Sequence, residues 1–265
     1  MDYFCSLASS SSGNAYLLCH RGFAILIDAG ISASRITAGL RAFGLEPSDL
    51  GAILITHEHI DHVKGLPVLL RRTRAKVFLT GGTYNAIQLN EDRACVYNAG
   101  DTLEFHGMTV RTFKTPHDAA ESVGFRFDDK GFSFGFATDF GYMPMEGEEL
   151  FKGVDFALVE ANYDREMLYS GSYPYYLKRR ISGTRGHHEN GDCGDFAARL
   201  VKNGTRALML AHLSRNNNTP AIARDTVCGV LEKESIRVGR DVVLEIAPPD
   251  TAGLFTFGTE ILCRE

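Results

Sequence analysis

The stretch ILITHEHIDH, residues 53–62, places three histidines and one aspartate within six residues, directly after an apolar run. The apolar residues 52–55 predict a buried strand, and the spacing of the apolar residues at 63–70 predicts a helix. The turn between these two elements carries His57, His59, Asp61 and His62. The rest of the chain is organised around this turn.

A divalent cation explains the turn better than a structural role does. In a core, each polar group without a partner would cost a few kcal/mol. In a solvated turn, the four side chains would have no reason to follow so apolar a strand. Imidazole nitrogen and carboxylate oxygen both bind zinc, manganese or iron. Alternate residues of an extended segment point the same way, so His57 and His59 can bind one ion. The start of the helix turns Asp61 and His62 away, so these two can bind a second ion.

The pattern H-x-H-x-D-H after an apolar strand resembles the signature of the metallo-β-lactamase superfamily, whose members are metal-dependent hydrolases. The resemblance implies the α/β metallo-β-lactamase fold, in which two mixed β-sheets flanked by helices form a four-layer αββα sandwich. With 265 residues, the chain fits one large domain, which we predict to span residues 1–265.

Composition narrows the class of protein. No apolar stretch approaches the roughly 18 residues that a transmembrane helix needs, and the N-terminal MDYFCSL lacks the basic region of an export signal. The six cysteines are widely spaced and include no C-x-x-C pair, which favours reduced thiols. A net charge of −5 excludes a wholly basic surface for nucleic acid, though not a local basic patch. We therefore expect a cytoplasmic protein with no membrane contact.

The superfamily resemblance implies further ligands at strand ends downstream. The strand at 108–115 ends in TPHDA, which places His117 behind Pro116, in a better position than His106 in the preceding turn. A hairpin over 122–138 ends in ATDFG, where Asp139 matches the carboxylate that the fold shares between two metals. The strand at 207–210 leads to His212 as the last ligand.

These residues complete two sets of ligands for two divalent ions, whether zinc, manganese or iron. The first set is His57, His59, His117 and Asp139, and the second is Asp61, His62, Asp139 and His212. Asp28 ends the apolar strand at 23–28 and could simply cap the following turn. In the superfamily, however, the matching aspartate supports the metal ligands and orients their imidazole rings.

Four segments narrow the resemblance to the YycJ group of bacterial proteins, also called WalJ. They are SSSSGN at 9–14, VEANYDREML at 159–168, SYPYYLKRRI at 172–181 and AHLSRNNNTP at 211–220, and the similarity covers about residues 4–231. The group's typical GHLSN appears here as GHHEN, so His187 matches the group's histidine, while His188 and Glu189 replace leucine and serine. The resemblance implies a metal-dependent phosphodiesterase, and a 5′-to-3′ DNA exonuclease activity is attributed to the group.

The chemistry of such a centre follows from its ligands. Two ions about 3.5–4 Å apart hold a hydroxide between them and polarise a phosphoryl or acyl oxygen. We expect Asp61 to orient the attacking water and His187 to serve the leaving oxygen, with His188 as the alternative. Polar groups near the strand ends are candidates for binding substrate, and these are Ser11, Ser12, Asn14, His188, Ser214, Asn217, Asn218 and Thr219.

Three function classes stay open at this point. A phosphodiesterase or nuclease acting on DNA or on a small phosphodiester is favoured, because the basic segment 178–180 and Arg185 precede His187. An acyl hydrolase, such as a lactonase or thioesterase, would use the same metals with an apolar pocket from the tyrosines at 173–176. Those tyrosines could equally be core, or a surface on which bases stack. A binding protein with structural metals is disfavoured by the intact ligand set.

The spacing of the last ligands limits how the substrate is bound. RNA-processing relatives of this fold often carry a large inserted domain between the equivalents of Asp139 and His212. Here 73 positions separate these two residues, and we expect one strand and about two helices in them. Short loops must therefore bind the substrate. The sequence does not determine which metal is native or whether the substrate is DNA or RNA. It also leaves open the polarity of cleavage and the oligomeric state.

Overall fold

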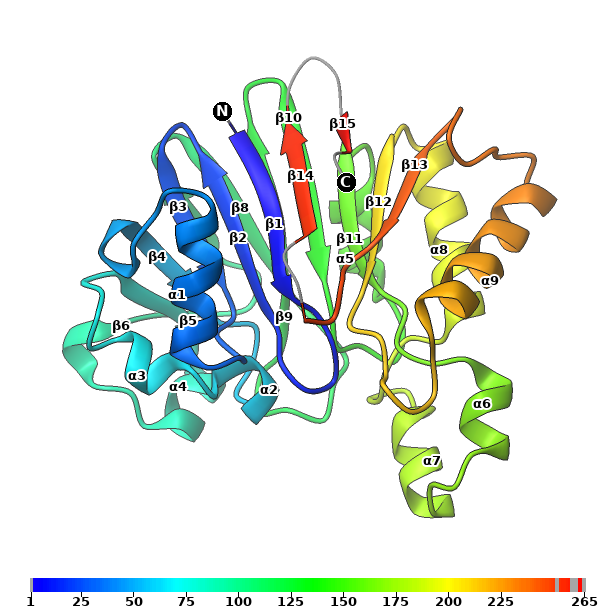
Figure 1. Ribbon diagram of the computed structural model, residues 1–265, viewed down its shortest axis with the longest axis horizontal. Coiled ribbons are helices and arrows are strands. Elements are labelled where there is room, and N and C mark those ends of the chain that lie inside the picture. Colours follow the sequence, from blue (N-terminus) through cyan, green and yellow to red (C-terminus); the bar gives the residue numbers. More distant parts are fainter. Residues whose placement is uncertain (1, 251–252, 258–261, 264–265) are drawn as a thin grey trace. The chain divides into compact units, whose positions relative to one another are not determined.

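The computed structural model of the protein describes residues 2–250, 253–257 and 262–263. The described residues form two compact units, each built around one sheet (Figure 1). The first unit lies within residues 1–99, 119–121 and 248–265, and the second consists of residues 100–118 and 122–247. The prediction of a single domain over residues 1–265 stays a prediction.

The first unit contains a mixed sheet of eight strands in the order β15-β14-β1-β2-β3-β4-β5-β6. The strands from β3 to β6 run parallel, whereas the others pair antiparallel. The strands are β1 (Asp2–Ala8), β2 (Ala15–His20), β3 (Phe23–Ile27), β4 (Leu50–Leu54), β5 (Lys76–Thr80), β6 (Ala94–Tyr97), β14 (Gly253–Phe257) and β15 (Leu262–Cys263). Parallel strands place their carboxyl ends at one edge, so the turns after β3 and β4 meet there.

Short helices connect the strands of the first unit. They are α1 (Ala33–Ala42), α2 (Ile60–Val63), α3 (Leu66–Leu69) and α4 (Gly81–Ile87), with 3₁₀ turns at Pro47–Asp49 and Glu91–Arg93. The helix predicted over 63–70 is instead split into α2 and α3. The break lies at Gly65, where a Cβ atom would stand only 2.0 Å from the carbonyl oxygen of Ile31. The following Pro67 donates no backbone hydrogen bond, which favours a new helix start over a continued helix.

The second unit contains a mixed sheet of seven strands in the order β13-β12-β11-β10-β9-β8-β7. The strands are β7 (Thr102–Phe105), β8 (Met108–Lys114), β9 (Val123–Asp129), β10 (Phe132–Ala137), β11 (Phe156–Glu160), β12 (Ala207–Ala211) and β13 (Val243–Ile246). From β7 to β10 they pair antiparallel, and from β10 to β13 they pair parallel. The predicted hairpin is β9 with β10, in which Phe132 pairs with Asp129.

The helices of the second unit are α5 (Met145–Phe151), α6 (Arg165–Ser170), α7 (Tyr175–Ile181), α8 (Asn190–Lys202) and α9 (Pro220–Lys233). Four of them lie between Asp139 and His212, so the expectation of about two helices there is wrong. The reason is that α6 and α7 have only six and seven residues and lack a continuous apolar stripe. The pattern of buried residues is clear only in α8.

Two properties that the composition predicts can be compared with the structure. In the part of the chain that the structure describes, no helix is both long enough and apolar enough to cross a membrane. The cysteines whose side chains are described, Cys5, Cys19, Cys95, Cys193 and Cys228, form no disulfide bond with one another. The expectation of reduced thiols stays a prediction.

Candidate metal centre

Three of the predicted site residues lie within two positions of the ends of buried strands and share an unusual backbone conformation. Asp28, Asp139 and His212 have φ angles of 59°, 58° and 57°, in the left-handed region that few residues other than glycine adopt. Each such residue costs of order 1–3 kcal/mol, and strain of this kind gathers at functional sites. The strands β3, β10 and β12 thus end in strained turns at the positions where the sequence predicts the metal centre.

In the first unit, Asp28 is the centre of a buried hydrogen-bond network. Its Oδ2 atom lies 2.7 Å from Nδ1 of His62. Its Oδ1 atom accepts from the backbone amide of Thr56 at 2.9 Å, and the hydroxyl of Thr56 lies 3.0 Å from Nδ1 of His57. Asp28 therefore fixes the ring of His62 directly and that of His57 through Thr56. This geometry is what the predicted supporting role of Asp28 requires.

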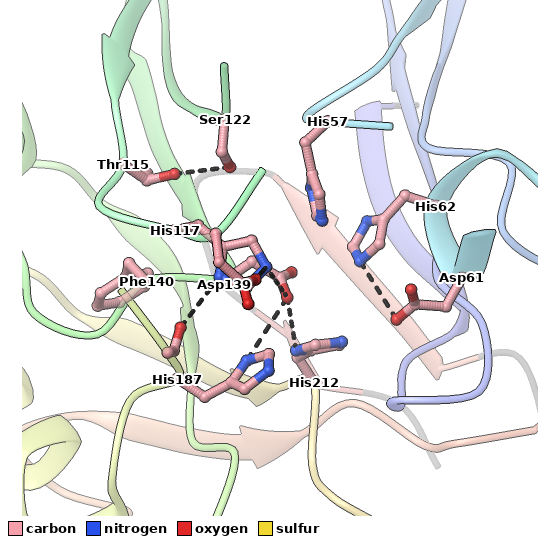
Figure 2. A network of polar contacts seen from close by, with 12 residues as sticks. His57, Asp61, His62, Thr115, His117, Ser122, Asp139, Phe140, His187 and His212 are labelled. Carbon is pink, nitrogen blue, oxygen red and sulfur yellow. Dashed lines mark hydrogen bonds and ion pairs between the residues drawn. The ribbon is translucent and has the colours of Figure 1, made fainter. Parts of the chain in front are cut away.

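The other predicted ligands of the turn at residues 57–62 lie close to this network. The rings of His57 and His59 are 4.6 Å apart between centroids, and those of His57 and His62 are 4.2 Å apart. The carboxylate of Asp61 approaches Nε2 of His62 at 3.6 Å (Figure 2). The backbone passes so close to residue 30 that a Cβ there would stand 1.6 Å from the carbonyl oxygen of Asp61. Only glycine fits in the DAG turn at this point.

Glu160 is the corresponding centre in the second unit. It is fully buried at the end of β11, and its Oε1 atom lies 2.7 Å from Nδ1 of His212 and 2.8 Å from Nδ1 of His187. Its Oε2 atom accepts from the backbone amides of Phe140 and His188, both at 3.1 Å. One carboxylate therefore orients two imidazole rings and the turn that follows Asp139.

The charges of this group act on one another. Burial by itself raises the pKa of Glu160, but the charge of His187 and the hydrogen bonds from His187 and His212 outweigh it and lower the pKa to about 2. Burial likewise disfavours the protonated form of His187, yet the charge of Glu160 and its hydrogen bond raise the pKa of this histidine. Glu160 and His187 thus each favour the charged form of the other.

Asp139 lies among three histidines of the second unit, as Figure 2 shows. Its Oδ1 atom is 3.7 Å from Nε2 of His117, 3.6 Å from Nδ1 of His187 and 3.5 Å from Nδ1 of His212. The Nδ1–H of His117 is positioned to donate to the carbonyl oxygen of Gly186 at 3.0 Å. Burial lowers the pKa of His117, which favours its neutral form.

Two observations indicate that these side chains could bind a divalent metal ion. Each observation concerns residues of one unit only. First, in each of three histidine rings the Nδ1 atom faces a carboxylate or carbonyl oxygen; these are His62, His117 and His212. Because Nδ1 then carries the proton of the neutral ring, the lone pair that could bind a metal is on Nε2. Metal-binding histidines are typically oriented in this way. Second, the predicted ligands of the second unit lie close together, because Oδ1 of Asp139 is within 3.7 Å of a ring nitrogen of both His117 and His212.

The predicted substrate-binding residues differ in exposure. Ser11 and Ser12 are exposed, whereas Asn14 is buried, with its amide nitrogen 3.2 Å from Nε2 of His62. His188 is only 4% exposed, and its ring lies 4.6 Å from that of Phe140. Its pKa is lowered by this burial. These positions give His187 and His188 different surroundings, although the roles predicted for them stay predictions.

The loop after His212 is held by hydrogen bonds within itself and to residues 161 and 190. The hydroxyl of Ser214 accepts from the backbone amide of Asn217 at 3.2 Å. The side-chain amide of Asn218 donates to Ala161 and Asn190 at 2.9 and 2.8 Å. Thr219 is exposed and caps helix α9 through the amide of residue 222. The predicted phosphate contacts of Ser214, Asn217, Asn218 and Thr219 stay predictions.

Sequence reasoning missed three residues that position the candidate ligands: Thr56, Glu160 and Asn162. The side-chain amide of Asn162 donates to the carbonyl oxygen of His212 at 2.7 Å. Glu160 could have been recognised, because an acid that ends an otherwise apolar strand is the same signal that identified Asp28. Thr56 and Asn162 carry no such signal, since hydroxyls and amides are common in turns.

Replacing Glu160 with glutamine tests the orienting role of this carboxylate. The substitution keeps the side-chain volume but removes the charge that pairs with His187, so we expect metal affinity or turnover to fall about 10–100-fold. Metal content and steady-state rates of the purified variant measure the effect. Glu232→Gln is a matched control, because Glu232 is an exposed residue of α9. An equal, small effect of both substitutions would contradict the role of Glu160.

Comparison with known proteins agrees with the geometry. The family described as "Beta-lactamase superfamily domain" matches residues 24–213. The exodeoxyribonuclease WalJ of Streptococcus pneumoniae serotype 2 is 36% identical over 255 residues, which cover 93% of this chain and 94% of that protein. The exodeoxyribonuclease YycJ of Bacillus anthracis is 35% identical over 242 residues, covering 89% and 92%. The chain therefore belongs to the metallo-β-lactamase superfamily, in the group that includes WalJ and YycJ.

A solved structure supports the fold. The metallo-β-lactamase fold protein YhfI from Bacillus subtilis matches with a TM-score of 0.72 and 15% sequence identity, over 96% of this chain and all of that one. The fold class predicted from the sequence, two mixed sheets flanked by helices in the metallo-β-lactamase fold, is confirmed. The buried clusters of histidines and carboxylates in this chain are consistent with a metal site.

Proposed function

We propose that the protein is a dinuclear metal-dependent phosphodiesterase that acts on DNA as a 5′-to-3′ exonuclease. The observation that carries the proposal is the similarity to WalJ and YycJ over 93% and 89% of the chain. Those relatives are named exodeoxyribonucleases. A cytoplasmic location suits such an enzyme and is part of the proposal.

Seven residues are the predicted metal ligands. We propose that His57, His59, His117 and Asp139 hold one divalent ion, and that Asp61, His62, Asp139 and His212 hold the other. When bound, such a pair of ions activates water and stabilises the charge that develops on a phosphoryl group. The ligand chemistry suits zinc, manganese or iron.

The side chains of the protein have separate tasks in this proposal. Asp61, which is partly exposed and borders His62, orients the attacking water. His187, 22% exposed and held by Glu160 through Nδ1, keeps Nε2 for the leaving oxygen or a phosphate oxygen. Its raised pKa favours the protonated form that can donate. The exposed hydroxyls of Ser11, Ser12 and Thr219 are the candidates for phosphate contacts.

A substrate panel tests the proposal against the acyl hydrolase that the same metals could support. Protein reconstituted with manganese or zinc is incubated with 5′-phosphorylated and 5′-hydroxyl DNA and RNA, and in parallel with lactones and thioesters. We expect release of mononucleotides from 5′-phosphorylated DNA. Turnover confined to lactones or thioesters would replace the nuclease by an acyl hydrolase.

Metal stoichiometry is a separate prediction. The seven proposed ligands supply eight contacts because Asp139 serves both ions, so protein prepared without a chelator should contain close to two metal equivalents per chain. Elemental analysis of the purified protein, before and after supply of manganese or zinc, measures this. A content that never exceeds one equivalent would contradict the dinuclear centre.

A further inference from the structure

Helices α6 and α7 form a hairpin that projects from the second unit beyond the ends of its parallel strands (Figure 1). The two helices contact each other, because the ammonium group of Lys178 donates to the carbonyl oxygens of Tyr169 and Gly171, both at 2.7 Å. The hydroxyl of Tyr169 also lies 3.1 Å from that of Ser182. The hairpin is therefore an ordered element despite its short helices.

The hairpin exposes aromatic side chains, which is unusual for a surface with no assigned role. Tyr175 is 69% exposed, Tyr176 is 74% exposed and Tyr169 is 53% exposed. The guanidinium of Arg179 lies over the ring of Tyr175, at 5.9 Å from its centroid. The rings of Tyr175 and Tyr176 are the most exposed of the three, so they are accessible to a ligand. The possibility that Tyr175 and Tyr176 belong to the core is excluded.

The charge of the hairpin is opposite to that of the protein as a whole. Residues 165–185 carry five basic side chains and one acidic one, a net charge of +4, whereas the whole chain has a net charge of −5. The basic residues are Arg165, Lys178, Arg179, Arg180 and Arg185, of which Arg165 pairs with Glu189 and Arg180 with Asp118, both outside this range. A local basic patch with interleaved aromatic rings is the composition of surfaces that bind single-stranded nucleic acid. A neutral acyl substrate would not require it.

The hairpin is also tied to the candidate metal centre within its own unit. The guanidinium of Arg185 donates to the carbonyl oxygen of His117 at 2.9 and 3.1 Å. The backbone amide of His187 donates to the carbonyl oxygen of Ile181, the last residue of α7, at 2.9 Å. On its other side, the hairpin meets the loop after His212, because the amide of Asn216 donates to the hydroxyl of Tyr173 at 2.6 Å.

We propose that the α6–α7 hairpin binds the single-stranded end of the DNA substrate, with bases stacked on Tyr175 and Tyr176 and the backbone phosphates on Arg179 and its basic neighbours. This inference rests on the proposed nuclease function and adds to it the surface that holds the strand. Stacking is tolerant of sequence because every base has a π-face. An exonuclease that advances along a strand needs such tolerance, and a compact chain without an inserted binding domain needs a local surface of this kind.

The test replaces both exposed tyrosines in the metal-loaded, full-length protein. The probe is a 5′-phosphorylated, phosphorothioate-linked oligodeoxynucleotide of about 20 nucleotides, which resists cleavage and carries a fluorophore for anisotropy. We expect the Tyr175→Ala/Tyr176→Ala variant to bind it with a dissociation constant raised roughly tenfold or more. Tyr175→Phe/Tyr176→Phe keeps both rings and should restore most of the affinity. Met145→Ala, at another exposed apolar residue of the second unit, is the control for surface truncation.

A second readout separates binding of the strand from chemistry. For each variant, turnover on DNA is divided by turnover on bis(p-nitrophenyl) phosphate, which has no bases to stack. We expect this ratio to fall at least about tenfold for the double alanine variant and to stay at the parental value for Met145→Ala. Arg179→Ala should weaken binding and flatten its dependence on salt concentration.

Each outcome bears on a different claim. If the parent degrades DNA and the double alanine variant binds and degrades it equally well, the hairpin does not hold the strand. If the parent hydrolyses no DNA at all, the proposed function fails first. If light scattering shows a dimeric parent and a monomeric double variant, the tyrosines cover a second copy of the chain, and the inference is overturned.

Discussion

Asp139→Ala should abolish hydrolysis and lower the metal content in the same preparation. Asp139 is 1% exposed, and its Oδ1 atom lies within 3.7 Å of three histidine nitrogens of its own unit. As the carboxylate proposed to be shared by both ions, it is the one ligand whose loss weakens both sites. We expect no measurable turnover on DNA and clearly less than two metal equivalents. Elemental analysis and single-turnover assays on the same sample measure the two effects together.

Asp139→Asn is the matched control for the fold. Residue 139 has a φ of 58°, a conformation that asparagine adopts more readily than alanine does. The asparagine variant therefore keeps the strained turn after β10 and removes only the charge. It should retain the circular dichroism and thermal transition of the parent, yet lose activity as the alanine variant does.

Asp28→Asn should have a smaller effect on metal affinity and turnover than the substitutions of Asp139. Asp28 has the same backbone conformation, but it contacts His62 and Thr56 and is not one of the proposed ligands. Its loss should cost about 10–100-fold in metal affinity or turnover. Near-normal turnover of the Asp139 variants with full metal occupancy would show that Asp139 is not a ligand.

The sequence predicts most of the fold because apolar strands and their polar ends are local signals. The hairpin β9–β10 and the strands before Asp28, His57 and His212 all follow from runs of apolar residues bounded by turns. The helix predicted over 63–70 is interrupted where Pro67 starts a new helix, and the close approach of Gly65 to the carbonyl oxygen of Ile31 at this break is a nonlocal contact that the sequence does not show. Helices α6 and α7 were not predicted, because neither has a continuous apolar face.

The candidate site shows the same division between local and nonlocal signals. Histidines and acids at strand ends are visible in the sequence, and within each unit the structure brings them together. What the sequence cannot show is which carboxylate holds which ring. Glu160 contacts His187 and His212, which lie 27 and 52 positions away, so only the pairing of β11 with β12 and the turn before α8 reveal which rings it holds.

His187→Ala is the second substitution with a large expected effect, and it separates chemistry from metal binding. The ring of His187 is 22% exposed, and its Nδ1 atom is held by Glu160 at 2.8 Å, so Nε2 is the atom offered to a substrate. Loss of a proton donor or a charge-assisted contact of this kind costs about 10²–10⁴-fold in rate. We therefore expect turnover on 5′-phosphorylated DNA to fall by that factor, while two metal equivalents remain bound.

His188→Leu is the control at the neighbouring position. His188 is 4% exposed and packs on Phe140, so truncation to alanine would leave a cavity and mix a packing defect with any loss of contact. Leucine, the residue typical of the YycJ group at this position, fills a similar volume. We expect the His188→Leu variant to keep turnover within a few-fold of the parent.

Metal content decides between two roles for His187. It offers a ligand atom within 4.8 Å of those of Asp139, Glu160 and His212, so the ring lies close enough to serve as a ligand itself. If His187→Ala loses metal and turnover in parallel, His187 is a ligand and another group serves the leaving oxygen. If both variants lose little activity, GHHEN is only the turn that begins α8. A large loss of rate at full metal occupancy, confined to His187→Ala, is the result that assigns this residue to the substrate.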